Sequence, residues 1–473
     1  MTRAEFAQLL GASATRVAEP RSGPILVSEA DPQRFMTAFT DAVQGQGEVF
    51  LGNPAWGTNE RAQLASLQVS GLSASVSLSE NRGQTPRRRP VDDPWDVSRQ
   101  QQGTPGGQLS RSAGCATDPG LAAASNRKAS TARSQVSAFA SGWLMIPTGG
   151  TSGRLKFGRH DEATLSAAVR GFARHFGLSQ VNAAGVLPLH HVSGLMAWLR
   201  CALTGGEYRP LDWKAIERGE LPDLPAQPSG WTISLVPTQL ERLLRRPAAV
   251  AWLKNYRIIF VGGGPAWPDL LDRAAALQLP VSLGYGMTET AAMITALRPE
   301  EFLAGARNSG AALPHATVKI GVGEGIVLGG DSLFLGYYPE RREPGDFATQ
   351  DRGLLDERSH LFVLGRRDAV IITGGEKVEP AEVEAVLRGC GEFPDVVVLG
   401  LPDAEWGQVV VAAYPAAARP EMAKVAVALA GLAPAKKPKR FVPVADWPAN
   451  AQGKVDRPRL LALVRDLKLK PET

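Results

Sequence analysis

The segment Met145–Phe157 carries the densest group of residues able to bind a polyphosphate. Glycines let the backbone turn tightly and point N–H groups at an anion, while hydroxyls add donors and a lysine adds positive charge. The hydroxyl of Thr151 is a candidate contact for a metal ion bound to the phosphates. A flexible loop of small residues is the alternative, and the spacing differs from that of the common P-loop. The candidate phosphate ligands are Thr148, Gly149, Gly150, Thr151, Ser152, Gly153 and Lys156.

A second group of reactive residues follows a predicted strand, in the sequence Tyr-Gly-Met-Thr-Glu-Thr at 285–290. Tyr285, followed by Gly286, could stack on a purine. Thr288 could hold a phosphate oxygen, and the carboxylate of Glu289 could hold Mg²⁺, which prefers oxygen ligands. The sequence therefore places a nucleotide-binding set at the end of one strand.

Three further stretches contain isolated charged residues. Asp351 lies in a turn, where an acid binds ribose hydroxyls or simply caps the turn. Gly365–Asp368 has two adjacent arginines, which a surface turn would also tolerate. Lys454 follows Gln452-Gly453 in a loop rich in Pro, Asn and Gly, where a solvated lysine is the plain alternative.

Alternating strands and helices must position these residues. An apolar strand over 143–147 leads into the glycine-rich segment, and β-α alternation from Ser137 onward predicts a parallel sheet covered by helices on both faces. Ligands bind at the carboxyl ends of such strands. Predicted strands are 48–54, 184–189, 231–236, 256–261 and 281–285, and predicted helices are 33–43, 59–67 (capped by Thr58 or Asn59), 162–176, 193–203, 238–244 and 269–277. We expect His191, Gly262, Gly263 and Gly264 at the same edge as Tyr285.

The chain is too long for one ordinary domain. After Ala311 the pattern changes to shorter strands, and a compact tail follows Asp368 with predicted strands 369–372, 396–400 and 409–414 and helices 380–387 and 421–432. We therefore expect two domains, 1–367 and 368–473. Residues 81–136 lack apolar periodicity and are expected to be disordered.

Composition excludes several classes of protein. No apolar run approaches 18 residues and no secretory signal is visible, so no membrane-spanning contact is expected. The three cysteines are far apart, which suits a reducing cytoplasm and shows no metal-ligand spacing. The net charge is only +5, and the basic run Lys436–Arg440 is better explained by a solvated loop or an anionic small ligand than by nucleic acid.

The glycine-rich segment, Tyr285–Thr290, Thr349–Asp351, Gly365–Asp368 and the terminal Gly-Lys pair occur in one order that resembles a known family. These are the adenylate-forming enzymes, which include acyl-CoA synthetases, the adenylation domains of peptide synthetases and luciferases. The similarity covers about residues 140–460, with a weaker likeness over 30–70. No single stretch is specific, whereas the set of five is. The resemblance implies a large N-terminal domain of parallel sheets flanked by helices and a small, mobile C-terminal α+β domain.

The resemblance also implies site roles for adenylation. Residues 148–156 would hold the β- and γ-phosphates of ATP, and Gly262–Gly264 with Tyr285 would frame the adenine. Thr288 would contact the α-phosphate and Glu289 the Mg²⁺. Asp351 and Arg366 would bind the ribose, and Lys454 would reach the acyl carboxylate and the α-phosphate.

Other roles concern the second step, in which coenzyme A accepts the acyl group. Asp368 would be the hinge, and a segment containing Gly374, Gly375 and Lys377 would enter the site after the C-terminal domain rotates. From its place after an apolar strand, His191 is expected to line the pocket of the acid, although a structural histidine is the alternative. His190 would then face the other side of the strand.

The chain departs from the family pattern in places. Gly149 stands where a hydroxyl is usual, Leu155 where proline is usual, and Gln350 replaces the usual glycine. None of these removes a charged group that the chemistry needs. The N-terminal part is short for the family, and its expected disordered segment occupies territory where relatives have sheet.

Within the family, the short length and residues 53–57, 147–153 and 188–195 resemble the o-succinylbenzoate–CoA ligases of menaquinone or phylloquinone synthesis. The leading hypothesis that this resemblance implies is an ATP- and CoA-dependent ligase acting on 2-succinylbenzoate, with a homo-oligomer left open. Alternatives are a ligase for another aryl or fatty acid, an enzyme that loads a carrier protein, and a non-catalytic binding protein. The presence of both Lys454 and Glu289 argues against the last.

Overall fold

The computed structural model describes residues 1–11, 23–67, 69, 72–74, 142–148, 155–226, 230–448 and 455–468. The segment 81–136, expected to be disordered, lies outside these residues. In the described part of the chain, no helix is both long and apolar enough to cross a membrane.

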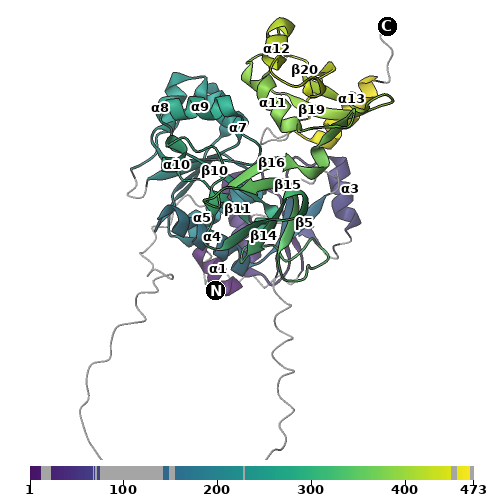
Figure 1. The fold of residues 1–473 in the computed structure, drawn as a ribbon. Helices are drawn as coiled ribbons and strands as arrows, with labels where there is room; N and C mark the ends of the chain where they lie inside the picture. The colour runs from purple at the N-terminus through teal and green to yellow at the C-terminus, as the bar shows by residue number, and fades with distance from the viewer. Residues whose placement is uncertain are drawn as a thin grey trace, which may run out of the picture. The chain divides into compact units, whose positions relative to one another are not determined.

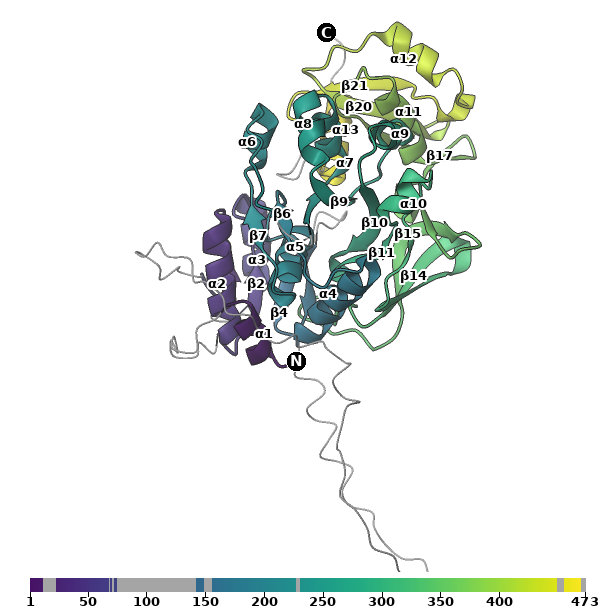
Figure 2. The same ribbon diagram turned by 90° about the vertical axis from the view of Figure 1, so that its left-hand side faces the viewer.

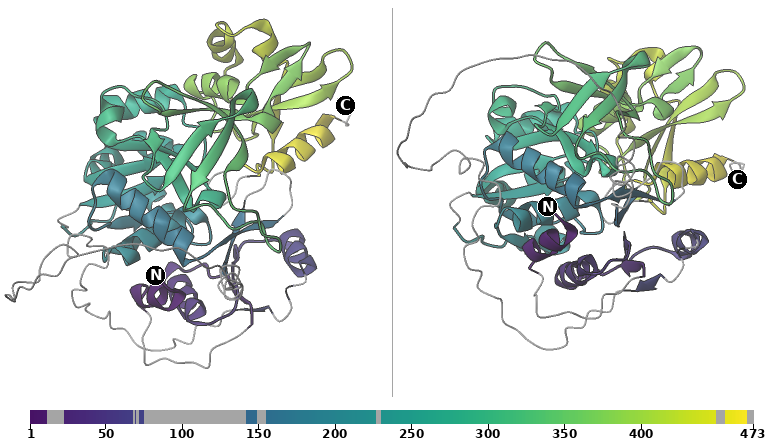
Figure 3. Two further views of the ribbon diagram at one scale, coloured as in Figure 1. Left: turned by 60° about the horizontal axis from the view of Figure 1, so that its bottom comes forward. Right: turned by 90° about the horizontal axis from the view of Figure 1, so that it is seen from below.

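The first sheet has the strand order β3-β1-β2-β4-β5. Its strands are β1 (Ile25–Val27), β2 (Val49–Leu51), β3 (Ser73–Ala74), β4 (Leu144–Thr148) and β5 (Lys156–His160), and its helices are α1 (Arg3–Leu9), α2 (Pro32–Gln44) and α3 (Thr58–Ser66). β4 pairs in parallel with β2, whereas β5 runs antiparallel to β4. Figure 3 shows α1 and α2, in purple, side by side near the N-terminus.

Two local predictions in this region need correction. The strand predicted for 48–54 ends at Leu51, before the proline. Helix α3 is preceded by Gly57 as its N-cap rather than by Thr58 or Asn59, because Glu60 three residues later accepts a hydrogen bond from the Gly57 N–H at 3.1 Å.

The second sheet has the order β12-β11-β10-β9-β8-β6-β7. From β7 to β10 the pairs are parallel, and β11 and β12 add an antiparallel edge. The strands are β6 (Ala183–Gly185), β7 (Tyr208–Pro210), β8 (Trp231–Leu235), β9 (Tyr256–Val261), β10 (Val281–Met287), β11 (Ala292–Ala296) and β12 (Ala311–Ala312). The helices are α4 (Glu162–Phe176), α5 (Val192–Leu203), α6 (Trp213–Arg218), α7 (Pro237–Leu244), α8 (Pro247–Leu253), α9 (Pro268–Ala276) and α10 (Pro299–Leu303).

Helices cover both faces of this sheet, as predicted. Alternate residues of β9 point to opposite faces: Phe260 packs with Phe172 of α4 in one apolar cluster, and Ile259 packs with Leu240 of α7 in another. Figure 2 shows α4 and α5 next to each other in the lower part of the folded body, and α7, α8 and α9 grouped in its upper part. Helix α4 matches its predicted bounds because Asp161 caps its N-terminus and Gly177, at φ 61°, ends it.

Two further sheets complete the described chain. β13 (Ala316–Ile320), β14 (Gly325–Gly330), β15 (Phe347–Leu355) and β16 (Leu361–Arg366) form an antiparallel meander. The last sheet contains β17 (Ile371–Thr373), β18 (Glu376–Val378), β19 (Val397–Asp403), β20 (Gly407–Pro415) and β21 (Arg440–Val444), with α11 (Pro380–Gly389), α12 (Met422–Leu429) and α13 (Arg457–Lys468). Figure 1 shows these elements in yellow-green. Asp368 lies between the two sheets, in a single 3₁₀ turn (Arg367–Ala369).

Candidate active site

The two ends of the glycine-rich segment lie side by side. Thr148, at the end of β4, is the register partner of Lys156, at the start of β5. Five of the predicted phosphate ligands lie outside the described residues: Gly149, Gly150, Thr151, Ser152 and Gly153. Thr148 is half-buried and Lys156 is exposed.

One face of β5 is directed at the strand end that carries Thr288 and Glu289. Side chains at alternate positions of a strand share a face, and here these positions are Lys156, Gly158 and His160. A Cβ on Gly158 would lie only 3.1 Å from Cγ2 of Thr288. The lack of a side chain at 158 therefore allows β5 to approach Thr288 closely.

His160 is a buried histidine that holds the main chain at Thr288. Its Nε2 lies 2.8 Å from the Thr288 carbonyl oxygen, and its Nδ1 lies 3.1 Å from Oγ1 of Thr164. Burial lowers the pKa of His160 to about 4, so the ring is neutral. Because a carbonyl can only accept, we assign the proton to Nε2.

Lys156 and Glu289 both lie next to Tyr337. The Tyr337 hydroxyl donates to Oε1 of Glu289 at 2.5 Å, and Nζ of Lys156 lies 5.3 Å from the Tyr337 ring centroid. Glu289 is 9% exposed and sits in the short 3₁₀ turn (Thr288–Thr290) after β10. A nearly buried carboxylate and an exposed ammonium thus share one aromatic ring.

Tyr285, Asp351 and Arg366 form a second cluster from β10, β15 and β16. The Tyr285 hydroxyl donates to Oδ2 of Asp351 at 2.7 Å, and an Arg366 Nη1 lies 3.7 Å from Oδ1 of the same carboxylate. Asp351 lies within β15 rather than in the predicted turn, and it is the direct register partner of Arg366. Burial, with Asp351 close by, raises the pKa of the Tyr285 phenol, so the hydroxyl remains a donor.

Arg366 also joins this cluster to the predicted hinge. Its Nε and Nη2 donate to the two carboxylate oxygens of Asp368, each at 2.8 Å. The hydrogen bond to Asp368 raises the pKa of Arg366. Arg366, which is expected to bind the ribose, is therefore paired with Asp368, the expected hinge.

The glycines at 262–264 end β9 beside β10, as predicted from the parallel sheet. Gly263 has φ 78°, and a Cβ on Gly264 would meet no atom within 4 Å. Both residues are exposed, so their backbone is open to a ligand at the carboxyl edge. A Cβ on Gly286, two positions before Thr288, would lie 1.9 Å from the Ala292 carbonyl oxygen. The lack of a side chain at 286 therefore allows β11 to pack closely against β10.

The strand predicted for 184–189 is shorter than expected, which changes the argument for His191. β6 ends at Gly185, and a turn closed by the His191 N–H and the Pro188 carbonyl leads to α5, of which His191 is the N-cap. The pleat does not continue, so alternation cannot separate the two histidines. Their ring centroids lie 4.4 Å apart; His190 is buried with a pKa lowered to about 3 by desolvation, and His191 is half-buried.

The remaining predicted residues come from the C-terminal sheet. Gly374 and Gly375 form the turn between β17 and β18, where the Gly374 N–H donates to the Trp406 carbonyl at 2.9 Å. Lys377 is exposed on β18. Lys454, the predicted adenylation lysine, lies outside the described residues.

The donor set fits a nucleotide and its metal ion. Asp351 offers carboxylate oxygens of the kind that bind a ribose diol, and Glu289 offers one to Mg²⁺. Among the described residues, no three His, Cys, Asp or Glu side chains gather to hold a metal ion.

Two of these residues were missed from the sequence. The sequence pattern predicted no strand over 156–160, so it did not indicate that His160 lies on the same face of β5 as Lys156. Tyr337 carries no local signal, because its bond to Glu289 joins residues 48 positions apart.

Comparisons with known proteins identify the family of this chain. Residues 91–338 match the model of the AMP-binding enzyme family, and the chain belongs to this family. A 2-succinylbenzoate–CoA ligase of Listeria monocytogenes serotype 4b is 35% identical over 58% of this chain and 60% of that protein. The ligase of that name from Enterococcus faecalis is 32% identical over 67% of this chain and 69% of its own length. The match to the first relative thus spans about 60% of that protein.

Solved structures show the same fold. An o-succinylbenzoate CoA synthetase (MenE) from Bacillus subtilis, in complex with the acyl-adenylate intermediate OSB-AMP, aligns with a TM-score of 0.67 at 23% identity, over 97% of this chain and 91% of that chain. The B. subtilis protein in complex with ATP and magnesium ion aligns with a TM-score of 0.67 at 22% identity, over 96% and 92%.

Proposed function

We propose that this chain is an ATP-dependent acid–CoA ligase that works through an acyl-adenylate. The observation that carries the proposal is the convergence, at the carboxyl end of β10, of a buried carboxylate (Glu289) with Lys156 and the Tyr285–Asp351–Arg366 cluster. These are the charges that a bound nucleotide triphosphate requires. The family and its named relatives support the same reaction class.

In the first half-reaction, a carboxylate oxygen of the acid attacks the α-phosphorus of ATP and pyrophosphate leaves. Two anions must meet, so positive charge has to compensate the transition state. Lys156 and Lys454 would supply it from this chain, and Glu289 would hold the Mg²⁺, which when bound polarises phosphoryl oxygens. Asp351 and Arg366 would hold the ribose, with Tyr285 and Gly262–Gly264 around the adenine.

In the second half-reaction, the thiol sulfur of coenzyme A attacks the acyl carbon and AMP leaves. We propose residues 1–367 and 368–473 as the two domains, with Asp368 as the pivot that brings Gly374, Gly375 and Lys377 to the acyl group. The adenylate is a mixed anhydride and must be kept from water between the steps. Rotation of one domain allows a single site to serve both reactions.

The proposed acid is 2-succinylbenzoate, the substrate that names the relatives above. The proposed location is the cytoplasm, which suits the free thiols of Cys201 and Cys390.

The test is a panel of aryl and fatty acids incubated with ATP and coenzyme A, with AMP release as the readout. Acid-dependent AMP and thioester formation supports the proposal. If AMP is released only with a different acid, that acid replaces 2-succinylbenzoate as the proposed substrate. If no acid causes AMP release, the proposed ligase activity is wrong.

Replacing His191 by alanine should raise the KM for the acid about tenfold, the loss expected for one hydrogen bond to a charged group. The KM for ATP should stay nearly constant, and His191→Asn, which keeps a donor, should recover part of the loss. His190→Ala is the matched control: its buried ring should affect the Tm more than the kinetic constants. If His191→Ala lowers the Tm and leaves the constants for the acid unchanged, His191 is structural.

Replacing Asp368 by proline should leave adenylate formation nearly intact and slow thioester formation about tenfold or more. Proline fixes φ near −65°, which suits the 3₁₀ turn but opposes the change in backbone angles that a pivot needs. Stopped-flow measurement of each half-reaction checks this. Asp368→Ala is the control, because it also removes the ion pair with Arg366 but leaves the backbone free to rotate. If wild type and Asp368→Pro form the thioester at equal rates, Asp368 is not the pivot.

A further inference from the structure

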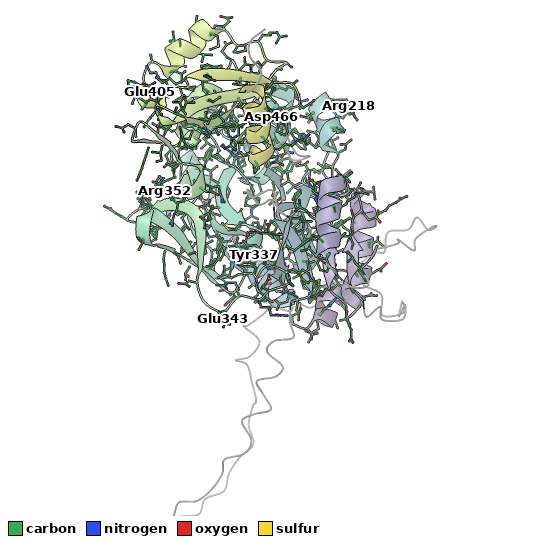
Figure 4. All side chains as sticks on the ribbon, turned by 90° about the vertical axis from the view of Figure 1, so that its right-hand side faces the viewer. Arg218, Tyr337, Glu343, Arg352, Glu405 and Asp466 are labelled. Atoms are coloured by element: carbon green, nitrogen blue, oxygen red, sulfur yellow. The ribbon has the colours of Figure 1, made fainter. Side chains whose placement is uncertain are left out.

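The main chain around Tyr337 is paired with the strand that follows the glycine-rich segment. Gly158 and Tyr337 form an antiparallel bridge. On either side, the Arg159 N–H donates to the Gly336 carbonyl and the Tyr338 N–H donates to the Phe157 carbonyl, both at 2.9 Å. The position of Tyr337 is therefore set by β5, the strand that carries Lys156. Tyr337 is labelled in Figure 4.

The ring and hydroxyl of Tyr337 are each engaged. Phe334 packs edge-on against the ring at 4.9 Å between centroids, and the Phe334 N–H donates to the Glu289 carbonyl at 2.8 Å. Glu289 is thus held at its main chain by Phe334 and at its carboxylate by Tyr337. Among the described residues, no further hydrogen bond reaches Oε2 of Glu289, which leaves that oxygen for a cation.

A tyrosine is a suitable partner for a carboxylate that must keep its charge. A nearly buried carboxylate needs a hydrogen bond, because leaving it without one costs free energy. An arginine or lysine would satisfy it but would cancel the negative charge that attracts Mg²⁺. A phenol donates a hydrogen bond without carrying charge.

The Tyr337 ring also offers a place for the ammonium of Lys156. The face of an aromatic ring attracts a cation within about 6 Å of its centroid, and Nζ lies 5.3 Å away. One tyrosine therefore contacts both charged groups, Glu289 through its hydroxyl and Lys156 through its ring. Each charge remains available to a phosphate or to a metal ion.

We propose that Tyr337 is a positioning residue that orients Glu289 toward the nucleotide-bound Mg²⁺ and holds the ammonium of Lys156 at its ring. The inference rests on the proposed function, because it assumes that the site binds Mg²⁺ and ATP. It predicts a defect that depends on the metal ion rather than a general loss of folding.

The test compares two substitutions by isothermal titration calorimetry of ATP in the absence of the acid, once with Mg²⁺ and once with EDTA. Tyr337→Phe removes the hydroxyl and keeps the ring. It should weaken ATP binding about tenfold with Mg²⁺ and leave binding in EDTA unchanged. Tyr337→Leu removes the ring as well and should weaken binding in EDTA too. Tyr338→Phe is the neighbouring control and should bind as wild type does.

A double-substitution cycle links the effect to Glu289. In a Glu289→Gln background, Tyr337→Phe should cause little further loss with Mg²⁺, because the two residues act as one unit. Equal binding by wild type and Tyr337→Phe in Mg²⁺, or an equal loss with and without Mg²⁺, would overturn the inference alone. Absence of ATP binding by the wild type would overturn both the inference and the proposed function.

Discussion

Replacing Lys454 by alanine should lower the rate of acyl-adenylate formation by about 10²–10³-fold, the usual cost of losing one group that stabilises transition-state charge. Lys454 is the last residue of Gln452-Gly453-Lys454, which resembles the adenylation loop of the family. A lysine neutralises the charge that develops when the carboxylate meets the α-phosphate. Pyrophosphate exchange measures this half-reaction. Transfer from chemically prepared acyl-adenylate to coenzyme A should continue at nearly the wild-type rate.

The control for this substitution is Lys424→Ala. Lys424 is exposed on α12, where it pairs with Glu421 at 3.0 Å and Glu392 at 3.3 Å. Exposed pairs contribute little, so both half-reactions should be unaffected. An equal loss of both half-reactions in Lys454→Ala would contradict the role assigned to Lys454.

Replacing Glu289 by glutamine should lower kcat/KM for adenylation about 10²-fold, because the site loses the charge that attracts Mg²⁺. The amide oxygen can still accept the hydrogen bond from Tyr337, so the geometry changes less than the charge. The variant should also need more Mg²⁺ to reach half its maximal rate. Initial rates over a magnesium titration, at fixed ATP and acid, give both quantities.

Glu343→Gln is the matched control for the loss of one negative charge. Glu343 is an exposed residue, labelled in Figure 4, and its substitution should leave the magnesium dependence unchanged. If Glu289→Gln has the same magnesium dependence as wild type, Glu289 is not a metal ligand. The hydrogen bond from Tyr337 would then be structural.

Local patterns in the sequence determined most of the helices and buried strands. Helix α4 and strand β9 have the bounds that their periodicity predicts, because capping and alternation depend on residues only a few positions apart. Chain order likewise indicated which residues to propose for the nucleotide site. Errors came where a short apolar run continued past the true strand end, as at β6.

The tertiary structure alone decided which of those residues touch. The bond between Tyr285 and Asp351 joins residues 66 positions apart, and the contact of His160 with Thr288 spans 128. Such contacts depend on sheet register and on the packing of β5 against the turn after β10, which no local pattern encodes. The sequence by itself therefore determined the types and order of the reactive residues. The pairing of β5 with the Gly336–Tyr338 segment decided that Tyr337 would hold Glu289, because long-range register places that hydroxyl beside the carboxylate.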